Sequence, residues 1–285
     1  MLNKVLPSDI RVIAWTPVRD DFSARFDCKQ RTYRYFFPKG TLNIKKMRIA
    51  SSYLIGQHDF RNLCKMDVAN GVVNFVRNIS DVRLAPFSSN QRLPSPIKKS
   101  SSSTTTMEDN STTTTDQTDQ SYNMYVLTIV SQAFLWHQIR CIMAVLLLVG
   151  EEAEEPEIVK DLLDVSTYPN KPQYSMASEI PLVLYECEYD DITWIIDEVN
   201  MQETVSTLQS KWSEMSIKST MLRAMLEDIS STANVCITSQ SNMLLPGNKP
   251  KVYKPLLSRP TCESLEDRIN YHNRKRKLKT LCESD

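Results

Sequence analysis

The chain has 285 residues, with 34 Lys plus Arg and 34 Asp plus Glu, so its formal net charge at pH 7 is zero. At roughly 100–200 residues per domain, this length supports one large or two modest domains with a real core. The seven cysteines form no CxxC pair and there are three histidines, which excludes zinc-ligand spacing and indicates reduced thiols in an intracellular protein. The apolar run at residues 141–149 is shorter than the roughly 20 residues that span a bilayer, so we expect no membrane partner. The five glycines lie far apart, which excludes a phosphate-binding loop or a dinucleotide fingerprint.

Two strands are predicted in the first 40 residues. Residues 9–17, DIRVIAWTP, have the composition of a strand that Pro17 closes. Residues 31–38, RTYRYFFP, are predicted as a second strand. Since side chains alternate along a strand, one of its faces carries Arg31, Tyr33, Tyr35 and Phe37.

Helices and further strands alternate irregularly along the rest of the chain. Residues 43–56 predict an amphipathic helix with Gly56 as its C-cap. Further strands are predicted at residues 73–86, 123–132 and 181–189, and further helices after residue 132 and at residues 156–165 and 202–229. The last helix carries a Met-rich apolar stripe that we expect to pack in a core: Val205, Leu208, Trp212, Met215, Met221, Leu222 and Met225.

The order of these elements predicts an α+β fold, an antiparallel-rich sheet with helices packed on one face, because regular βαβ spacing is missing. Residues 100–121 contain fourteen Ser or Thr and no aromatic residue, so little in them can be buried. We expect a disordered insert at residues 95–121, in an expanded hairpin loop.

Charge is segregated along the chain. Residues 25–48 carry eight basic residues and one acid, and aromatic residues are interleaved with them. A basic and aromatic strand is typical of proteins that hold looped or single-stranded RNA. The alternative is a solvated strand whose aromatic side chains lie in the core.

Arg140 raises a question of charge balance. It precedes the apolar run CIMAVLLLV, and a guanidinium in such surroundings needs an acidic partner unless its head reaches water. The sequence alone does not identify this acid. Trp136 and His137, one turn earlier, are interpreted as structural residues.

Three blocks in register resemble the TruA family of tRNA pseudouridine synthases. They are FSARFDCKQRTYRYFF (22–37), IGQHDFRNLCK (55–65) and AFLWHQIRCIMAVLLLVG (133–150), and the resemblance runs from Leu2 to about Tyr189. HDFRNLCKMDVANGVVNF and YKPLLSRP (253–260) are similar to the eukaryotic branch, which acts at tRNA positions 38 and 39 of the anticodon stem-loop.

The resemblance implies an isomerase that converts uridine to pseudouridine in tRNA without a metal or an organic cofactor. It implies the C-terminal half of the pseudouridine synthase fold, and a flipped uridine held on an aromatic platform. The expected partner is the anticodon stem-loop of tRNA. A homodimer is a further expectation, and the expected location is the nucleus, the cytoplasm or both.

The resemblance also assigns residues. Tyr33 matches the active-site tyrosine that stacks on the base and serves the final proton transfer, and Arg140 matches the helix arginine that pairs with the catalytic aspartate. Leu182 matches a leucine of the base pocket. For RNA binding we expect Arg25, Arg31 and Arg34, while Phe60 is scaffold or lies near RNA. The alternatives are a half-buried sheet tyrosine, an arginine that extends to the surface, and core packing for the leucine.

The nucleophilic aspartate of the family lies in a GRTDxG motif, and this chain has no such motif. We therefore expect residues 1–18 to be the remnant of an N-terminal catalytic domain, residues 19–192 the C-terminal α+β domain, and residues 193–285 a helical extension with a basic tail. Such a chain would be catalytically inactive alone, as a partial gene product or a short isoform. The alternatives are a non-catalytic tRNA-binding module and a truncated product that does not fold stably.

Overall fold

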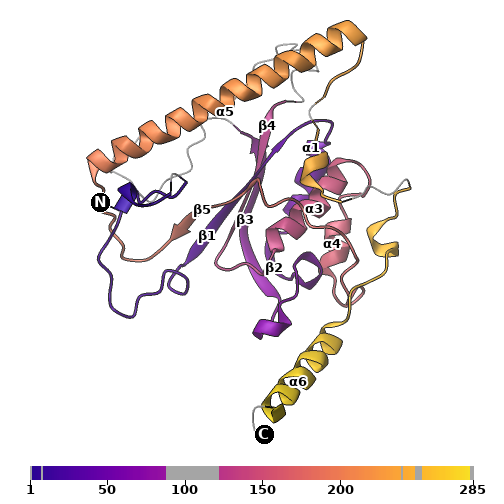
Figure 1. Cartoon of the computed structure of the whole chain (residues 1–285). Coiled ribbons are helices and arrows are strands. Elements are labelled where there is room, and N and C mark those ends of the chain that lie inside the picture. Colours follow the sequence, from indigo (N-terminus) through magenta and orange to yellow (C-terminus); the bar gives the residue numbers. More distant parts are fainter. Residues whose placement is uncertain (1, 8, 88–121, 239, 248–251, 283–285) are drawn as a thin grey trace. The chain divides into compact units, whose positions relative to one another are not determined.

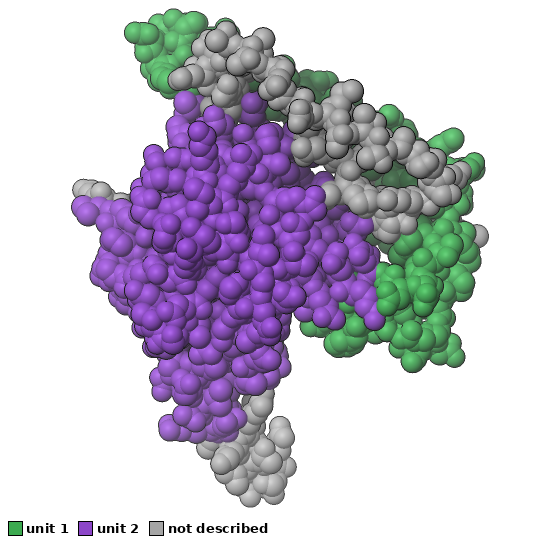
Figure 2. All heavy atoms as spheres, turned by 180° about the vertical axis from the view of Figure 1, so that it is seen from behind, with its two compact units in different colours: residues 1–28, 92–112, 189–237 green, residues 29–91, 113–188, 238–285 purple. Residues whose placement is uncertain are grey.

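The structure is a computed structural model that describes all residues except 1, 8, 88–121, 239, 248–251 and 283–285. Over residues 276–282 it describes the backbone alone. The chain forms two compact units, drawn purple and green in Figure 2. The first, here called the sheet unit, comprises residues 29–91, 113–188 and 238–285. The second, the α5 unit, comprises residues 1–28, 92–112 and 189–237. The insert predicted at residues 95–121 lies outside the described residues.

The described part of the sheet unit contains a five-stranded antiparallel sheet with the order β2-β3-β4-β1-β5 (Figure 1). The strands are β1 (Gln30–Pro38), β2 (Gly56–Asp59), β3 (Val76–Pro86), β4 (Met124–Ser131) and β5 (Leu182–Glu188). β1 pairs with β4 on one side and β5 on the other, so Tyr33 lies between Ile129 and Leu184. The predicted α+β class, the antiparallel sheet and four of its strands are confirmed.

Three helices pack against one face of this sheet, as predicted. They are α1 (Ile44–Ser52), α3 (Gln138–Gly150) and α4 (Ile158–Leu163), seen beside the sheet in Figure 1. Tyr35 and Phe37 of β1 are fully buried in the core that these helices form with the sheet. Eleven of the thirteen residues of α3 are buried. Short 3₁₀ helices connect the elements: η1 (Leu2–Lys4), η2 (Arg61–Leu63), η3 (Val68–Asn70), η4 (Asn242–Leu244) and η5 (Leu256–Ser258).

Gly150, the last residue of α3, lies close to the start of α1. A Cβ on Gly150 would lie 2.7 Å from Met47 Sδ and 2.9 Å from Leu42 Cδ2, so the side chains of Met47 and Leu42 would have to move to make room for a larger residue. The Gly150 carbonyl also accepts a hydrogen bond of 2.8 Å from the amide of Asn43, which caps the first turn of α1 through its side chain. The ends of α1 and α3 are therefore joined by both packing and a backbone hydrogen bond.

Two predicted elements are wrong in type or extent. Residues 9–17 form no strand: in the described residues, Trp15 alone of them makes a bridge, an antiparallel one with Ile195. A strand without a continuous partner is marginal in water, which explains why the composition was misleading. The helix predicted over residues 43–56 ends at Ser52, because Gly56, with φ of 107°, begins β2 instead of capping the helix.

The α5 unit is organised around α5 (Glu198–Ala233), the helix predicted over residues 202–229. The carboxylate of Asp197 caps it by accepting from the amides of Val199 and Asn200. Asn200 also donates to the carbonyl of Val12, and its side-chain oxygen accepts from Asn3 at 2.8 Å. The first residues of the chain are thereby attached to the first turn of α5.

The prediction that the apolar stripe of α5 packs in a core is wrong. Its residues are between 44% and 71% exposed, with Trp212 the most exposed. The remaining helix, α6 (Leu265–Cys282), carries the basic tail and belongs to the sheet unit. No helix in the described part of the chain is both long and apolar enough to cross a membrane. Within the same residues, no three His, Cys, Asp or Glu side chains are grouped to hold a metal ion.

We predict that Ile142→Ala lowers the free energy of unfolding by about 2–5 kcal/mol, because Ile142 is 1% exposed in the core and its truncation leaves a cavity. The matched control is Ile49→Ala on α1, where the side chain is 49% exposed and the change should stay within about 0.5 kcal/mol. Denaturant unfolding of the two variants measures both values. Equal losses would contradict the placement of α3 in the core.

Candidate active site

The two tyrosines of β1 lie on the same face of the sheet, two residues apart. Tyr33 is half-buried, and its ring meets that of Phe134 edge-on at 5.2 Å between centroids. Tyr35 is fully buried, and its hydroxyl donates a hydrogen bond of 2.9 Å to the carbonyl of Ser178. Burial raises the pKa of Tyr35, so this phenol stays a donor. Tyr33 is the more accessible of the two phenols.

Arg140 lies in the first turn of α3 and has an acidic partner. Its Nη2 is 2.8 Å from Glu179 Oε2, and its Nε donates to the carbonyl of Ala177 at 2.7 Å. The backbone carbonyl of Arg140 in turn accepts from the amide of Ala177 at 3.1 Å. The Arg140 side chain is 17% exposed and that of Glu179 is 70% exposed. The guanidinium is therefore fixed by a buried carbonyl, while its carboxylate partner is largely in water.

Leu182 begins β5 directly after this segment. Its amide donates to the carbonyl of Glu179 at 2.9 Å, and it pairs with Tyr35 across the sheet. Leu182 is partly buried and packs against the core. Residues 177–182 therefore connect α3, β1 and β5, and they bring Arg140 and Leu182 together beside Tyr35. We call the candidate site Tyr33, Tyr35, Arg140, Glu179 and Leu182.

His137 caps the N-terminus of α3 in a left-handed conformation, with φ of 56°. Its Nδ1 lies 3.0 Å from Sδ of Met176, a weak acceptor for the tautomer that carries hydrogen on Nδ1. Burial lowers the pKa of His137, and the positive charge of Arg140 adds to the effect. A neutral imidazole is therefore favoured beside the guanidinium.

The arginines predicted to bind RNA have different surroundings. Arg25 is exposed beside the ring of Phe26, and the Nη1 of Arg31 donates to the carbonyl of Gln132. Arg34 is 7% exposed, with its guanidinium 3.6 Å from the centroid of Tyr185. Its Nε has no hydrogen-bond partner among the described residues. β1 alternation places Arg34 on the sheet face opposite Tyr33.

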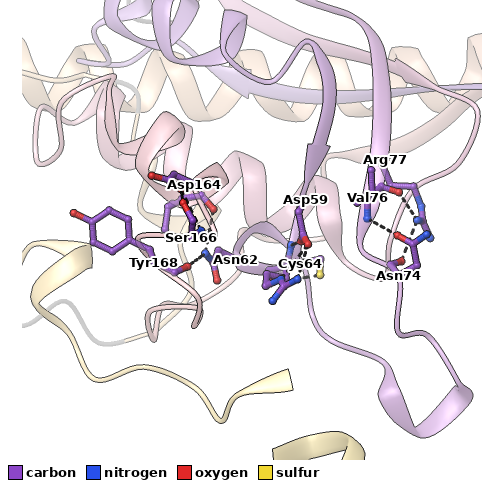
Figure 3. Close-up of polar contacts among 11 residues, drawn as sticks. Asp59, Asn62, Cys64, Asn74, Val76, Arg77, Asp164, Ser166 and Tyr168 are labelled. Atoms are coloured by element: carbon purple, nitrogen blue, oxygen red, sulfur yellow. Dashed lines mark hydrogen bonds and ion pairs between the residues drawn. The ribbon is translucent and has the colours of Figure 1, made fainter. Parts of the chain in front are cut away.

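The block at residues 55–65 supports the fold from within. Phe60 is fully buried, and the side-chain Nδ2 of Asn62 donates to the backbone carbonyls of Tyr168 and Leu162 at 2.7 and 3.1 Å (Figure 3). The figure also shows Ser166 folded back onto the carboxylate of Asp164, and hydrogen bonds from Ser166 and then Thr167 lower the pKa of Asp164 to about 2. Asn62 therefore fastens the block to the end of α4, in agreement with the scaffold interpretation of Phe60.

Sequence reasoning did not identify Glu179 or Tyr35 as members of the site, or Phe134 as a neighbour of Tyr33. Glu179 is 39 positions from Arg140, and no spacing rule relates a helix residue to a loop residue at that separation. The alternation of β1 did place Tyr35 on the face of Tyr33, which is the one signal that was present.

Comparisons with known proteins agree on one family. A family model described as tRNA pseudouridine synthase matches residues 50–190. Three similar proteins are each named tRNA pseudouridine(38/39) synthase: one from Bos taurus, 40% identical over 98% of this chain, one from Homo sapiens, 38% over 98%, and one from Saccharomyces cerevisiae, 33% over 93%. The chain spans 57%, 57% and 54% of the length of these relatives, respectively.

We predict that the free energy of unfolding falls as the pH drops from 7 to 5.5, and falls less in His137→Asn. The folded state lowers the pKa of His137, so the unfolded chain takes up the proton first, near its ordinary pKa of about 6.5. Asn tolerates the left-handed conformation of this position. Denaturant unfolding across this pH range measures the difference. Superimposable pH profiles would show that His137 contributes nothing to it.

We also predict an unequal response of the ion pair. Arg140→Met should cost about 1–3 kcal/mol of unfolding free energy, because the buried carbonyl of Ala177 loses its charged donor. Glu179→Gln should cost less than about 1 kcal/mol, since the pair is open to water on the side of the carboxylate. Arg83→Met, at an arginine 60% exposed, is the control. If both partners cost the same, the carbonyl is not what fixes Arg140.

Proposed function

Through residues 50–190 this chain belongs to the tRNA pseudouridine synthase family, and we propose that it takes part in converting uridine to pseudouridine at positions 38 and 39 of the tRNA anticodon stem-loop. The observation that carries the proposal is that residues 177–182 join Arg140, which donates to the carbonyl of Ala177, to Leu182, which pairs with Tyr35 of the strand that carries Tyr33. Each of these three residues matches a site position of the family in the resemblance described above.

The proposed reaction breaks the bond from N1 of the base to C1′ of the ribose and forms a bond from C5 to C1′. The C5 proton is then lost and N1 ends protonated, so no electron is gained or lost. The protein needs to hold a flipped base, hold an ionised carboxylate and move a proton. The candidate site contains side chains suited to these tasks: an aromatic ring for the base, a guanidinium for the carboxylate and a phenol for the proton.

Tyr33 and Arg140 have the surroundings for two of these roles. Tyr33 is half-buried in a rigid sheet and keeps its ring edge-on to Phe134, which fixes the plane on which a base would stack. Arg140 is held by Ala177, so the guanidinium is already positioned when a carboxylate arrives. Here that carboxylate belongs to Glu179, whose exposure makes it exchangeable for another.

A second candidate function is non-catalytic binding of tRNA. It is favoured by an Arg140 that already holds a carboxylate, that of Glu179. For RNA contact we propose Arg25, which is exposed, and Arg31, which is partly exposed. A homodimer and a location in the nucleus, the cytoplasm or both stay predictions.

The first experiment mixes the purified chain with an anticodon stem-loop RNA that has uridine at positions 38 and 39. We expect binding that weakens steeply between 50 and 200 mM salt, and no pseudouridine by mass spectrometry. Arg31→Gln should weaken binding and lower the salt slope by about one, whereas Lys46→Gln should not, because Lys46 lies between Glu152 and Glu155. Failure to bind RNA would contradict both candidate functions.

The second experiment separates the two candidates. A polypeptide carrying the GRTDxG motif of the family is added to the same mixture, and pseudouridine is measured again. The enzyme proposal expects conversion at positions 38 and 39 to appear, and to fall by about 10²-fold or more in Tyr33→Phe. Leu184→Val, at the exposed neighbour of Tyr33 on β5, is the control. Binding without any conversion favours the non-catalytic function.

A further inference from the structure

Some of the exposed apolar residues of α5 repeat every seven residues. This set, here called the stripe, omits Met221 and Met225 of the predicted core stripe and adds Leu226 and Ile229. With Val205 assigned to position a of a heptad abcdefg, the a and d positions carry Val205, Leu208, Trp212, Met215, Leu222, Leu226 and Ile229, and Ser219 interrupts the series at a. All seven side chains are exposed, by 40% to 71%. Spacing by three and four residues is the pattern of a helix that packs against one other helix.

The stripe is long enough for a stable helix pair. α5 has 36 residues, which corresponds to about 54 Å at 1.5 Å per residue. Asp197 caps its start and Asn234, with φ of 50°, ends it, so the helix is defined at both ends. Contacts with the first residues of the chain involve its first turn, at Asn200, and leave the stripe beyond Val205 exposed.

The positions that flank the stripe are selectively basic. From residue 202 to 232, the e and g positions carry Lys211, Lys218 and Arg223 and no acid. The acids of this segment lie further from the stripe, where Glu214 pairs with Lys218 and Glu227 with Arg223. These exposed pairs are weak, so both bases can exchange their acids for those of a neighbouring helix.

A second copy of α5 does not fit this arrangement. In a parallel pair, position g faces position e of the next heptad, which sets Lys218 against Arg223 of the other copy. In an antiparallel pair, g faces g, which sets Lys211 and Lys218 against each other. An anionic membrane surface fits poorly too, since Glu214, Glu227 and Asp228 lie on the same helix.

We propose that α5 is a docking helix for an amphipathic partner helix that has apolar residues at its own a and d positions and Asp or Glu at e and g. The partner buries the stripe from Val205 to Ile229, and its acids pair with Lys211, Lys218 and Arg223. This function is separate from the proposed work on RNA, and it requires none of the candidate site residues.

The test uses the whole chain and two synthetic 28-residue heptad peptides that share Ile at a and Leu at d. One carries Glu at every e and g position and the other carries Lys. Fluorescence anisotropy of the labelled peptides measures binding, and we expect the Glu peptide to bind at least about ten-fold more tightly, a difference of about 1.4 kcal/mol. Equal affinity, or no binding of either peptide, would overturn the proposal.

Variants on one helix locate the surface. Leu208→Glu and Leu222→Glu should each weaken binding of the Glu peptide at least about ten-fold. Ile217→Glu is the matched control, because Ile217 is 60% exposed, like Leu208 and Leu222, but lies at position f, away from the stripe. Its effect should stay below about two-fold. An equal loss in the control would show that the peptide binds elsewhere.

A charge reversal tests the partner's chemistry. The double variant Lys211→Glu, Lys218→Glu should prefer the Lys peptide over the Glu peptide. Sedimentation of the chain without peptide tests the rival occupant: a dimer that Leu222→Glu dissociates would identify a second copy on the stripe and overturn the proposal. Binding of the unmodified chain to anionic vesicles, lost in Leu222→Glu and retained in Ile217→Glu, would overturn it in favour of a membrane surface.

Discussion

The candidate site depends on how the sheet unit accommodates one largely buried guanidinium. Arg140 extends from an apolar helix, where an unpaired charge would cost several kcal/mol. Its Nε finds the buried carbonyl of Ala177, and the backbones of the same two residues share a second hydrogen bond. Arg140 donates one of these hydrogen bonds and accepts the other, so they fix α3 to the segment that leads into β5. The charge is satisfied by a fixed neutral acceptor, and the carboxylate of Glu179 is an addition to it.

The same segment, residues 177–182, is also hydrogen-bonded to β1. The hydroxyl of Tyr35 bonds to the carbonyl of Ser178, so residues 177–182 are held from the sheet as well as from the helix. Tyr33 projects from the same face two residues away, on the strand between β4 and β5. A half-buried phenol on a central strand moves little, while the partner of Arg140 is 70% exposed. The arginine is thus held by a buried carbonyl, and the most exposed member of the site is the acid.

The sequence was a good guide where burial has a clear period. That holds for β1, which alternates, and for β4, which is almost wholly buried; β3 and β5 have no such clear pattern, yet all four strands lie within three residues of their predicted bounds. Residues 9–17 have a similar composition, but a strand needs a partner that composition does not reveal. A glycine after an apolar helix pattern predicts a cap, but the positive φ that a cap needs is also found where β2 begins, at Gly56. Tyr33, Arg140 and Leu182 came from motifs, whereas Glu179 depends on a tertiary contact between α3 and a loop.

The helices α3 and α5 differ in the width of their apolar surface, and this decides what can cover each. α3 is apolar nearly all round and is buried by the sheet, α1 and α4. The stripe of α5 occupies two positions in seven, which is too narrow for a globular core and suits a single helix. The basic residues beside the stripe then select the partner, because the acids of α5 lie further from the stripe and cannot reach a helix packed on it. A net charge of zero therefore conceals a largely buried charge at Arg140 and a charged surface on α5, whose properties follow from where individual charges lie.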